Sequence, residues 1–346
     1  MIKLQWRAPA GATDVQGLVQ NAIELEFATL PPYLYTKLSI LPGTNGSAAA
    51  RLNGIILQEM IHMCLACNIM NAIGGTPAIK PPHYPRPLPG DVGGGLVIHL
   101  LPFSQAAMQQ GMAIEEPSKP LDPPQLRAVA GDKTVTIGEY YHLLDLALQQ
   151  LPGSAWTANR NQIDDNQFFP GQIFAVNTYD DAHRAIMQIV SEGEGTPVTP
   201  GGEGSPLDFQ NELAHYYRFW ELERNQVLVK ADNTAGYAWN GVLGVDWKAV
   251  YPAIPDPETH DFSKDPPAAQ QAQTACNQAY MAMVNALTGT FMGATGGLGV
   301  AVRAMFDLRM AALKALHTPL ADGKSVSGPA FLYLEVPQAS AGGDAA

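Results

Sequence analysis

The chain of 346 residues is 46% hydrophobic and 15% charged, which leaves ample apolar material for a large core. Its length allows one elaborated domain or two small ones. The formal net charge of −12, from 32 acidic and 20 basic residues, argues against a nucleic-acid-binding surface, because such a surface needs clustered lysine and arginine.

Two long helices are predicted near the start of the chain, at residues 14–40 and 47–73. Asp14 has the residue type and position of an N-cap. Pro31 and Pro32 interrupt the first pattern, because proline removes a hydrogen-bond donor and clashes with the preceding turn, so we expect one kinked helix rather than two. The second segment is apolar nearly all the way round, which is typical of a buried helix.

The middle of the chain is less regular. Residues 77–135 form an insertion rich in proline and glycine, in which a short apolar run at 96–101 predicts a strand or an extended arm. A short helix is expected at 104–113, within this insertion. A further helix is predicted at 136–151.

Four more helices are predicted in the second half, at residues 180–194, 208–222, 268–287 and 298–316. We interpret residues 1–346 as a single domain built on a helical bundle. The segment 268–336 then supplies additional helices and an extended tail.

The most informative motif is Glu-x-x-His, because residues i and i+3 share one helix face and can bind the same cation. It occurs three times, as Glu59/His62, Glu139/His142 and Glu212/His215. Fourteen glutamates and eight histidines would give roughly 0.3 matches by chance, so three matches require an explanation.

The three pairs differ in their surroundings. Glu139 follows Thr136 by three residues, which is the spacing of a capping box. A role in capping the helix therefore accounts for a glutamate at this position without a metal. Glu59 and His62 lie in the middle of an apolar helix, where an unpaired carboxylate is costly. The alternative to a metal is an internal ion pair of Glu59 with histidine or arginine. Glu212 near a helix start also has the ordinary explanation that acids favour the helix dipole there.

Single glutamates that could complete a metal site come in adjacent pairs. The first helix offers Glu24 or Glu26, and the helix at 180–194 offers Glu192 or Glu194. Glu26 lies two turns before Tyr33 on the same face. Residue spacing alone leaves both choices open.

Several stretches resemble the ferritin-like proteins grouped with iminophenyl-pyruvate dimer synthase, an enzyme of violacein- and rebeccamycin-type indole pathways. The matching residues are 22–34, which end in Pro-Pro-Tyr-Leu, 58–62, 189–195, which contain Glu-Gly-Glu-Gly, 212–219, 136–140 and 328–331. In ferritin-like dinuclear proteins two helices each supply Glu-x-x-His and two others each supply one glutamate. The resemblance therefore implies an all-α, ferritin-like four-helix bundle with long insertions and additional C-terminal helices.

The resemblance also implies a set of metal ligands, namely Glu26, Glu59, His62, Glu194, Glu212 and His215, with Glu24 and Glu192 as the alternatives. Carboxylate and imidazole ligands together suit iron, and manganese as a second choice. Two such ions could bind dioxygen or peroxide. We expect an oxidoreductase that acts on a small amino-acid-derived molecule, although no catalytic base or nucleophile is identifiable.

Other functions stay open. One is a coupling enzyme like the dimer synthases, which join two imines derived from indole-3-pyruvate and carry much additional protein. Another is an iron-handling protein, although the insertion at 77–135 would obstruct packing into a cage. The third is a structural or interaction protein without catalysis. We expect a small-molecule substrate, no nucleic-acid partner and no membrane association, and the oligomeric state is open.

The cysteines and the N-terminus bear on the cellular compartment. Cys64, Cys67 and Cys276 are too few for a disulfide framework, and the N-terminus has no long apolar region. We therefore expect a cytoplasmic protein. Cys64 and Cys67 are spaced like a redox motif, but they lie inside the apolar helix at 47–73, which favours core packing.

Overall fold

The computed structural model describes residues 4–7, 9–87, 96–116, 133–193, 212–230 and 237–334. Helices dominate this part of the chain. They are α1 (Ala12–Leu38), α2 (Gly46–Ala72), α3 (Gln105–Ile114), α5 (Ile137–Gln149), α6 (Tyr179–Glu192), α7 (His215–Arg224), α8 (Pro267–Phe291) and α9 (Gly297–Leu316). Three single turns of 3₁₀ helix occur at Gly153–Ala155, Pro257–Thr259 and Phe262–Lys264.

The described strands form three two-stranded antiparallel ribbons at the periphery. β1 (Leu4–Trp6) pairs with β4 (Lys133–Val135), β2 (Arg86–Pro87) pairs with β3 (Val97–Ile98), and β5 (Gln226–Lys230) pairs with β6 (Tyr237–Val242). Each is too small to carry a core of its own. The apolar run predicted at 96–101 thus contributes only the short strand β3.

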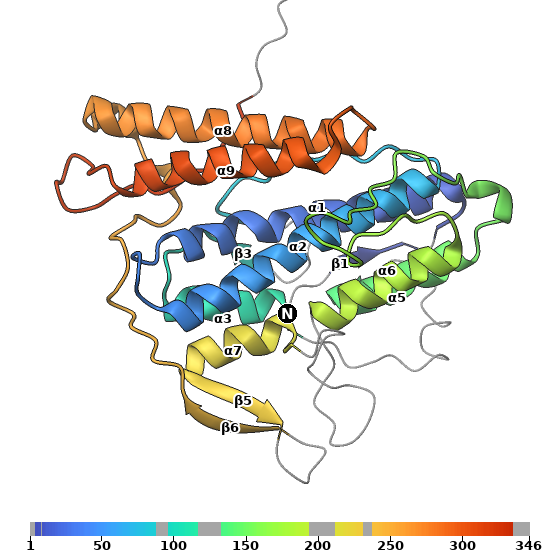
Figure 1. The fold of residues 1–346 in the computed structure, drawn as a ribbon, viewed down its shortest axis with the longest axis horizontal. Coiled ribbons are helices and arrows are strands. Elements are labelled where there is room, and N and C mark those ends of the chain that lie inside the picture. The colour runs from blue at the N-terminus through green and yellow to red at the C-terminus, as the bar shows by residue number, and fades with distance from the viewer. Residues whose placement is uncertain are drawn as a thin grey trace, which may run out of the picture.

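The two long helices α1 and α2 form the spine of the molecule (Figure 1). α1 runs through Pro31 and Pro32 as one element, in agreement with the single helix predicted there. It begins at Ala12, so Asp14 lies in its first turn and accepts a hydrogen bond from the Ala10 amide, and the prediction of Asp14 as N-cap was wrong.

α2 is apolar enough to raise the question of a membrane span. By length and composition Gly46–Ala72 could cross a bilayer, and within the described residues it alone passes that test. However, 89% of its most apolar window is buried inside the fold. This burial is what the sequence predicted for a helix with apolar residues on all sides, and it identifies α2 as a core helix.

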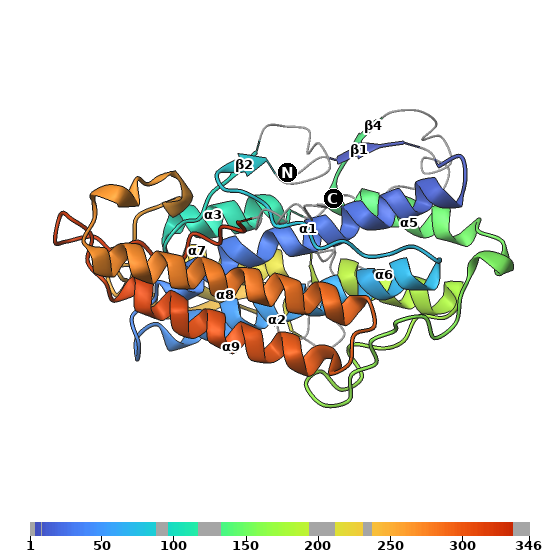
Figure 2. The same cartoon turned by 90° about the horizontal axis from the view of Figure 1, so that it is seen from above.

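The other half of the bundle consists of two short helix pairs placed along the spine. Figures 1 and 2 both show α3 and α7 together at one end of α1 and α2, and α5 and α6 together at the other. α6 and α7 approach each other where the amide of His215 donates to the carbonyl of Gly193, at 3.0 Å. The bundle is therefore interrupted at its middle on this side.

The C-terminal helices α8 and α9 form a hairpin that covers α1 and α2 on the face opposite α7 (Figure 1). Phe27 of α1 stacks on Tyr280 of α8, with ring centroids 6.4 Å apart. Asn71 of α2 donates its side-chain amide to the carbonyl of Phe291 at 3.0 Å. The predicted additional C-terminal helices thus extend the hydrophobic core of the bundle.

Capping boxes define the N-terminal ends of two helices, α5 and α6. Thr136 and Glu139 form the predicted capping box at the start of α5, which is confirmed. Thr178 and Asp181 form a second one at the start of α6. The helix predicted at 208–222 is described from residue 212 onward and becomes helical only at His215.

All three cysteines are buried, so we expect them to be unreactive in the folded protein. Burial raises the pKa of the Cys64 thiol to about 12, with a smaller contribution from Asp165, and burial raises the pKa of Cys276 to about 12. Because the thiolate is the nucleophile, alkylation by iodoacetamide at pH 8 should leave the native protein unlabelled. Guanidinium-unfolded protein should take up three labels, and rapid native labelling would contradict this.

Candidate metal centre

Six side chains of the types that ligate metals converge where the two short helix pairs meet. They are Glu26 of α1, Glu59 and His62 of α2, Glu115 at the C-terminal end of α3, Glu192 at the end of α6 and His215 at the start of α7. All six are buried. The interruption of the bundle thus brings the ends of α3, α6 and α7 to the site, where they face the sides of α1 and α2.

The cluster contains two groups of three ligands that share one residue. Glu26, Glu59 and His62 each offer a ligand atom within 4.8 Å of the others, and so do Glu59, Glu115 and His215. The rings of His62 and His215 lie 5.6 Å apart, centroid to centroid. Glu59 is therefore placed as a carboxylate between two potential metal positions.

His62 lies between two carboxylates. Its Nε2 is 2.9 Å from an oxygen of Glu192, and its Nδ1 is 3.4 Å from an oxygen of Glu26. Burial lowers the pKa of His62, but the two carboxylates outweigh it and the net pKa is raised well above the usual value. Without a cation, the centre thus favours a protonated imidazole.

His215 is oriented by a neighbour on α2. Its Nε2 lies 3.2 Å from the side-chain oxygen of Gln58, which accepts a hydrogen bond when Nε2 carries the proton. Its Nδ1 is 2.7 Å from Glu59 Oε1, yet it has no hydrogen-bond partner among the described residues. A ring held by one nitrogen, with the other lone pair facing carboxylates, is typical of a metal-ligating histidine.

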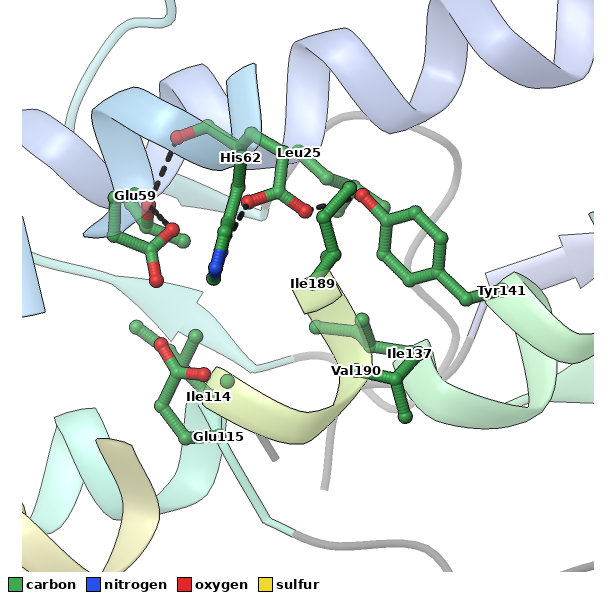
Figure 3. A pocket seen from close by; sticks show the side chains of 12 residues that line it. Leu25, Glu59, His62, Ile114, Glu115, Ile137, Tyr141, Ile189 and Val190 are labelled. Atoms are coloured by element: carbon green, nitrogen blue, oxygen red, sulfur yellow. Dashed lines mark hydrogen bonds and ion pairs between the residues drawn. The ribbon is translucent and has the colours of Figure 1, made fainter. Parts of the chain in front are cut away.

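Three hydroxyl groups hold the carboxylates in place. Thr29 donates to Glu59 Oε2 at 2.6 Å, Tyr33 donates to Glu115 Oε1 at 2.5 Å, and Tyr141 donates to Glu26 Oε1. Figure 3 shows Glu59 and His62 on one side of the cavity, Glu115 facing them, and the Tyr141 hydroxyl directed toward the carboxylate beside His62. The other oxygen of each carboxylate faces the Nδ1 atom of a histidine, at 2.7 Å for Glu59, 3.4 Å for Glu26 and 3.7 Å for Glu115.

The charges of the cluster do not balance among its own residues. Four buried carboxylates face two imidazoles, and no lysine or arginine in the described part of the chain pairs with any of the four. Burial, followed by the charge of Glu115, raises the pKa of Glu59 to about 7. Buried anions of this kind need protons or cations for neutralisation.

Two helix ends add to the negative electrostatic potential that the buried carboxylates create. The C-terminal ends of α3 and α6 both lie at the cluster, since Glu115 follows α3 and Glu192 ends α6. A helix C-terminus carries a partial negative charge and favours cations. These two helix ends therefore prefer the same kind of ligand as the carboxylates, whereas the N-terminal end of α7 at His215 carries a partial positive charge.

The space between the ligands suits metal ions rather than a substrate. The cavity measures about 30 Å³, which is room for roughly two or three water-sized bodies. Oε1 of Glu192 has no hydrogen-bond partner among the described residues. A mixed set of carboxylates and imidazoles around such a space fits a pair of iron or manganese ions.

Of the residues predicted from the sequence, the structure brings together Glu26, Glu59, His62 and His215. From the adjacent pair on α6 it places Glu192 in the cluster, whereas Glu194 lies outside the described residues. Glu24, the alternative to Glu26, instead pairs with Lys80 at 2.5 Å.

Glu212 is not part of the cluster, in contrast to the prediction. Its side chain is 55% exposed and pairs with Arg218 at 2.9 Å. The physical reason is the start of α7 at His215: the i, i+3 spacing places two side chains on one face only within a continuous helix, and Glu212 precedes the helix.

Glu115 takes the position in the cluster that the prediction gave to Glu212, and sequence reasoning missed it. It lies just beyond the helix predicted at 104–113 and was not among the predicted ligands. One signal was present in the sequence, because an acid at a helix C-terminus is unfavourable with respect to the helix dipole and thus requires a compensating partner.

A test of these contacts is to replace Tyr141 by phenylalanine, which removes the hydroxyl on Glu26. Loss of a partner that orients a ligand typically costs tenfold to hundredfold in metal affinity, and we expect a loss of about that size in a chelator competition titration. Tyr140→Phe is the matched control, because the neighbouring Tyr140 hydroxyl donates to the Leu18 carbonyl. Equal affinity of the two variants would contradict a role of Tyr141 at the centre.

Comparisons with known proteins bear on this arrangement. Residues 19–224 match the family model described as Ferritin-like. Dichlorochromopyrrolate synthase of Lentzea aerocolonigenes is 22% identical over an alignment that covers 81% of this chain but 31% of that protein, so the chain spans about a third of this relative. A crystal structure of a ferritin-like protein from Caulobacter vibrioides superposes with a TM-score of 0.62 at 23% identity, over 93% of this chain and 99% of that chain.

Proposed function

We propose that this chain, which belongs to the ferritin-like family, binds two metal ions and catalyses an oxidation of a small amino-acid-derived molecule with dioxygen or peroxide. The family membership and the helical bundle confirm the predicted fold class. Iron is the metal that we propose first, and manganese is the alternative.

The observation that carries the proposal is the shared position of Glu59. A carboxylate that belongs to two ligand groups would serve as a shared ligand of two cations. The four buried carboxylates, when ionised, carry a negative charge equal to the positive charge of two divalent ions, and the two imidazoles add neutral donors. Bound together, two such ions supply the redox equivalents for dioxygen or peroxide chemistry.

The protein's own part in this function is to hold the ligands. Gln58 accepts a hydrogen bond from His215 when Nε2 carries the proton, and in that tautomer Nδ1 would be left for a metal. Thr29, Tyr33 and Tyr141 each fix one carboxylate oxygen. Apolar side chains complete the cavity wall and limit water access; they are Leu25, Ile114, Ile137, Ile189 and Val190.

A coupling enzyme is the second candidate, and the relative named dichlorochromopyrrolate synthase is the observation that favours it. The chain spans about a third of that relative, so its activity is a separate proposal for this protein. The number of iron ions bound per chain distinguishes an enzyme from an iron-handling protein. A storage protein would continue to take up iron far beyond two ions per chain.

Anaerobic titration with Fe(II), followed by metal analysis and exposure to air in an oxygen electrode, tests the proposal. We expect about two iron ions per chain and an oxygen uptake that the metal-free protein lacks. Parallel loading with Mn(II) establishes the preferred metal. A protein that retains no metal after desalting would refute the proposed function, and continued uptake of many iron ions per chain would favour iron handling instead.

A further inference from the structure

The outer face of helix α9 carries a group of exposed apolar side chains. Val300, Phe306 and Met310 are 45%, 61% and 65% exposed. The buried residues of the same helix, such as Leu308 and Ala312, lie on the opposite face and join it to the rest of the fold. Figure 2 shows α9 along one edge of the molecule, with α8 beside it. Apolar side chains grouped on an exposed helix face typically mark an interaction surface.

Two charged residues complete this face. Arg303 and Asp307 are exposed, and within the described part of the chain neither has an ion-pair or hydrogen-bond partner for its side chain. The stripe advances by three, four and three residues, which is the spacing of the contact positions in a two-helix coiled coil. Its four members are Val300, Arg303, Asp307 and Met310. We call these four residues and the neighbouring Phe306 the α9 stripe.

The α9 stripe is complementary to itself when two copies lie antiparallel. With residue 305 at the two-fold axis, Val300 of one copy would face Met310 of the other. Arg303 would then face Asp307, and each of these contacts would occur twice, as a two-fold symmetric interface requires. Phe306 is one residue from the axis, so the two Phe306 rings would lie about 3 Å apart along the helix direction.

The charges favour this direction over a parallel one. In a parallel pair Arg303 would face Arg303 and Asp307 would face Asp307, and like charges in a contact oppose association. The antiparallel pair instead forms two ion pairs between the copies. Because desolvation offsets much of the attraction in such pairs, they contribute more to orientation than to affinity. The affinity would come from the three apolar side chains.

We propose that α9 is the interface of a homodimer, in which the α9 stripes of two copies of this chain pack antiparallel about a two-fold axis. A contact made by one helix from each copy is smaller than the roughly 1,200–2,000 Å² that stable interfaces bury. We therefore expect a dissociation constant on the order of 10–100 μM. The metal cluster contains no side chain of α9, so this proposal does not rest on the proposed function.

Sedimentation velocity between about 5 and 500 μM protein tests the dimer, and the wild type should change from monomer to dimer over this range. Phe306→Ser should weaken association at least about tenfold, because it removes the aromatic contact at the axis. Val242→Ser is the matched control, since Val242 is 73% exposed but lies on β6, and it should leave association unchanged. A wild type that stays monomeric at about 500 μM would overturn the proposal and leave this face to a different partner.

Charge reversal tests the antiparallel pairing. Arg303→Asp would place carboxylates opposite each other at both charged contacts, and Asp307→Arg would do the same with guanidinium groups. Each variant alone should therefore remain monomeric up to about 500 μM. In a mixture of the two variants, the carboxylates of one copy face the guanidinium groups of the other at both contacts. We expect this mixture to form a heterodimer with an affinity within about threefold of that of the wild type.

The combined variant with Arg303→Asp and Asp307→Arg should also recover the dimer, because the two charges only exchange places. All the substituted side chains are exposed, so the variants should fold. Association of either single charge variant as tight as that of the wild type would overturn the proposal. A mixture of the two that remains monomeric would overturn it as well.

Discussion

Glu59→Gln is expected to lower the metal content from about two ions per chain to less than one. Glu59 belongs to both ligand groups, so its loss removes a donor from each position at once. Glutamine keeps the size and one oxygen but not the negative charge. An amide oxygen is a poor substitute for a carboxylate that would be shared by two divalent cations.

The same change should stabilise the metal-free protein. Burial, followed by the charge of Glu115, raises the pKa of Glu59 to about 7, so ionised Glu59 destabilises the folded state. For a carboxyl group with a raised pKa this penalty is complete above the folded-state pKa and disappears as the pH falls toward the unfolded-state value. At pH 8 with a chelator present, we expect the free energy of unfolding of Glu59→Gln to exceed that of the wild type by on the order of 1–3 kcal/mol. The difference should shrink between pH 7 and about pH 4.5.

Metal analysis after anaerobic loading and desalting measures the first effect, and denaturant unfolding measures the second. Glu24→Gln is the matched control, because Glu24 lies on α1 close to Glu26 but pairs with Lys80. It should keep the wild-type metal content. If Glu59→Gln retained both ions, or Glu24→Gln lost them, the assignment of the centre would be wrong.

Gly111→Ala is expected to destabilise the protein by about 1–3 kcal/mol, even though alanine is the better helix former by about 1 kcal/mol. An added Cβ at Gly111 would lie 2.7–2.8 Å from three atoms of the Phe219 ring. Phe219 is fully buried and also packs on Tyr33, with ring centroids 5.0 Å apart, so the ring has little room to move.

This contact joins α3 to α7 and thereby sets the distance between two ligands. Glu115 follows the end of α3 and His215 begins α7, with 3.7 Å between His215 Nδ1 and Glu115 Oε2. If α3 is displaced, Glu115 moves away from His215. Gly111→Ala should therefore weaken metal binding as well as lower stability, although residue 111 is no ligand.

Gly17→Ala is the matched control for this substitution. Gly17 also lies within a helix, but its added Cβ would have no atom within 4 Å. It should stabilise the protein by roughly 0.5–1 kcal/mol and leave metal binding unchanged. Equal behaviour of the two variants in denaturant unfolding would show that the contact between Gly111 and Phe219 does not constrain the helices.

The parts of the structure that depend on local periodicity and on capping were predictable from the amino-acid pattern alone. Helix α2 was predictable because its apolar residues surround the whole helix, and the start of α5 was predictable from the Thr136–Glu139 capping box. Glu59 and His62 were recognisable because they lie three residues apart within one continuous helix. Their spacing in the sequence is their spacing in space.

Only the tertiary structure decided the rest of the centre. Glu115, Glu192 and His215 lie at the ends of three different helices, where the i, i+3 rule gives no information about position. The same rule misplaced Glu212, because α7 begins after it. How α3, α6 and α7 meet depends on contacts between residues distant in sequence, such as Gly111 with Phe219 and Gly193 with His215. No local pattern in a single sequence encodes such contacts, so packing decided the positions of these three residues, although His215 and, as an alternative, Glu192 were predicted from the sequence.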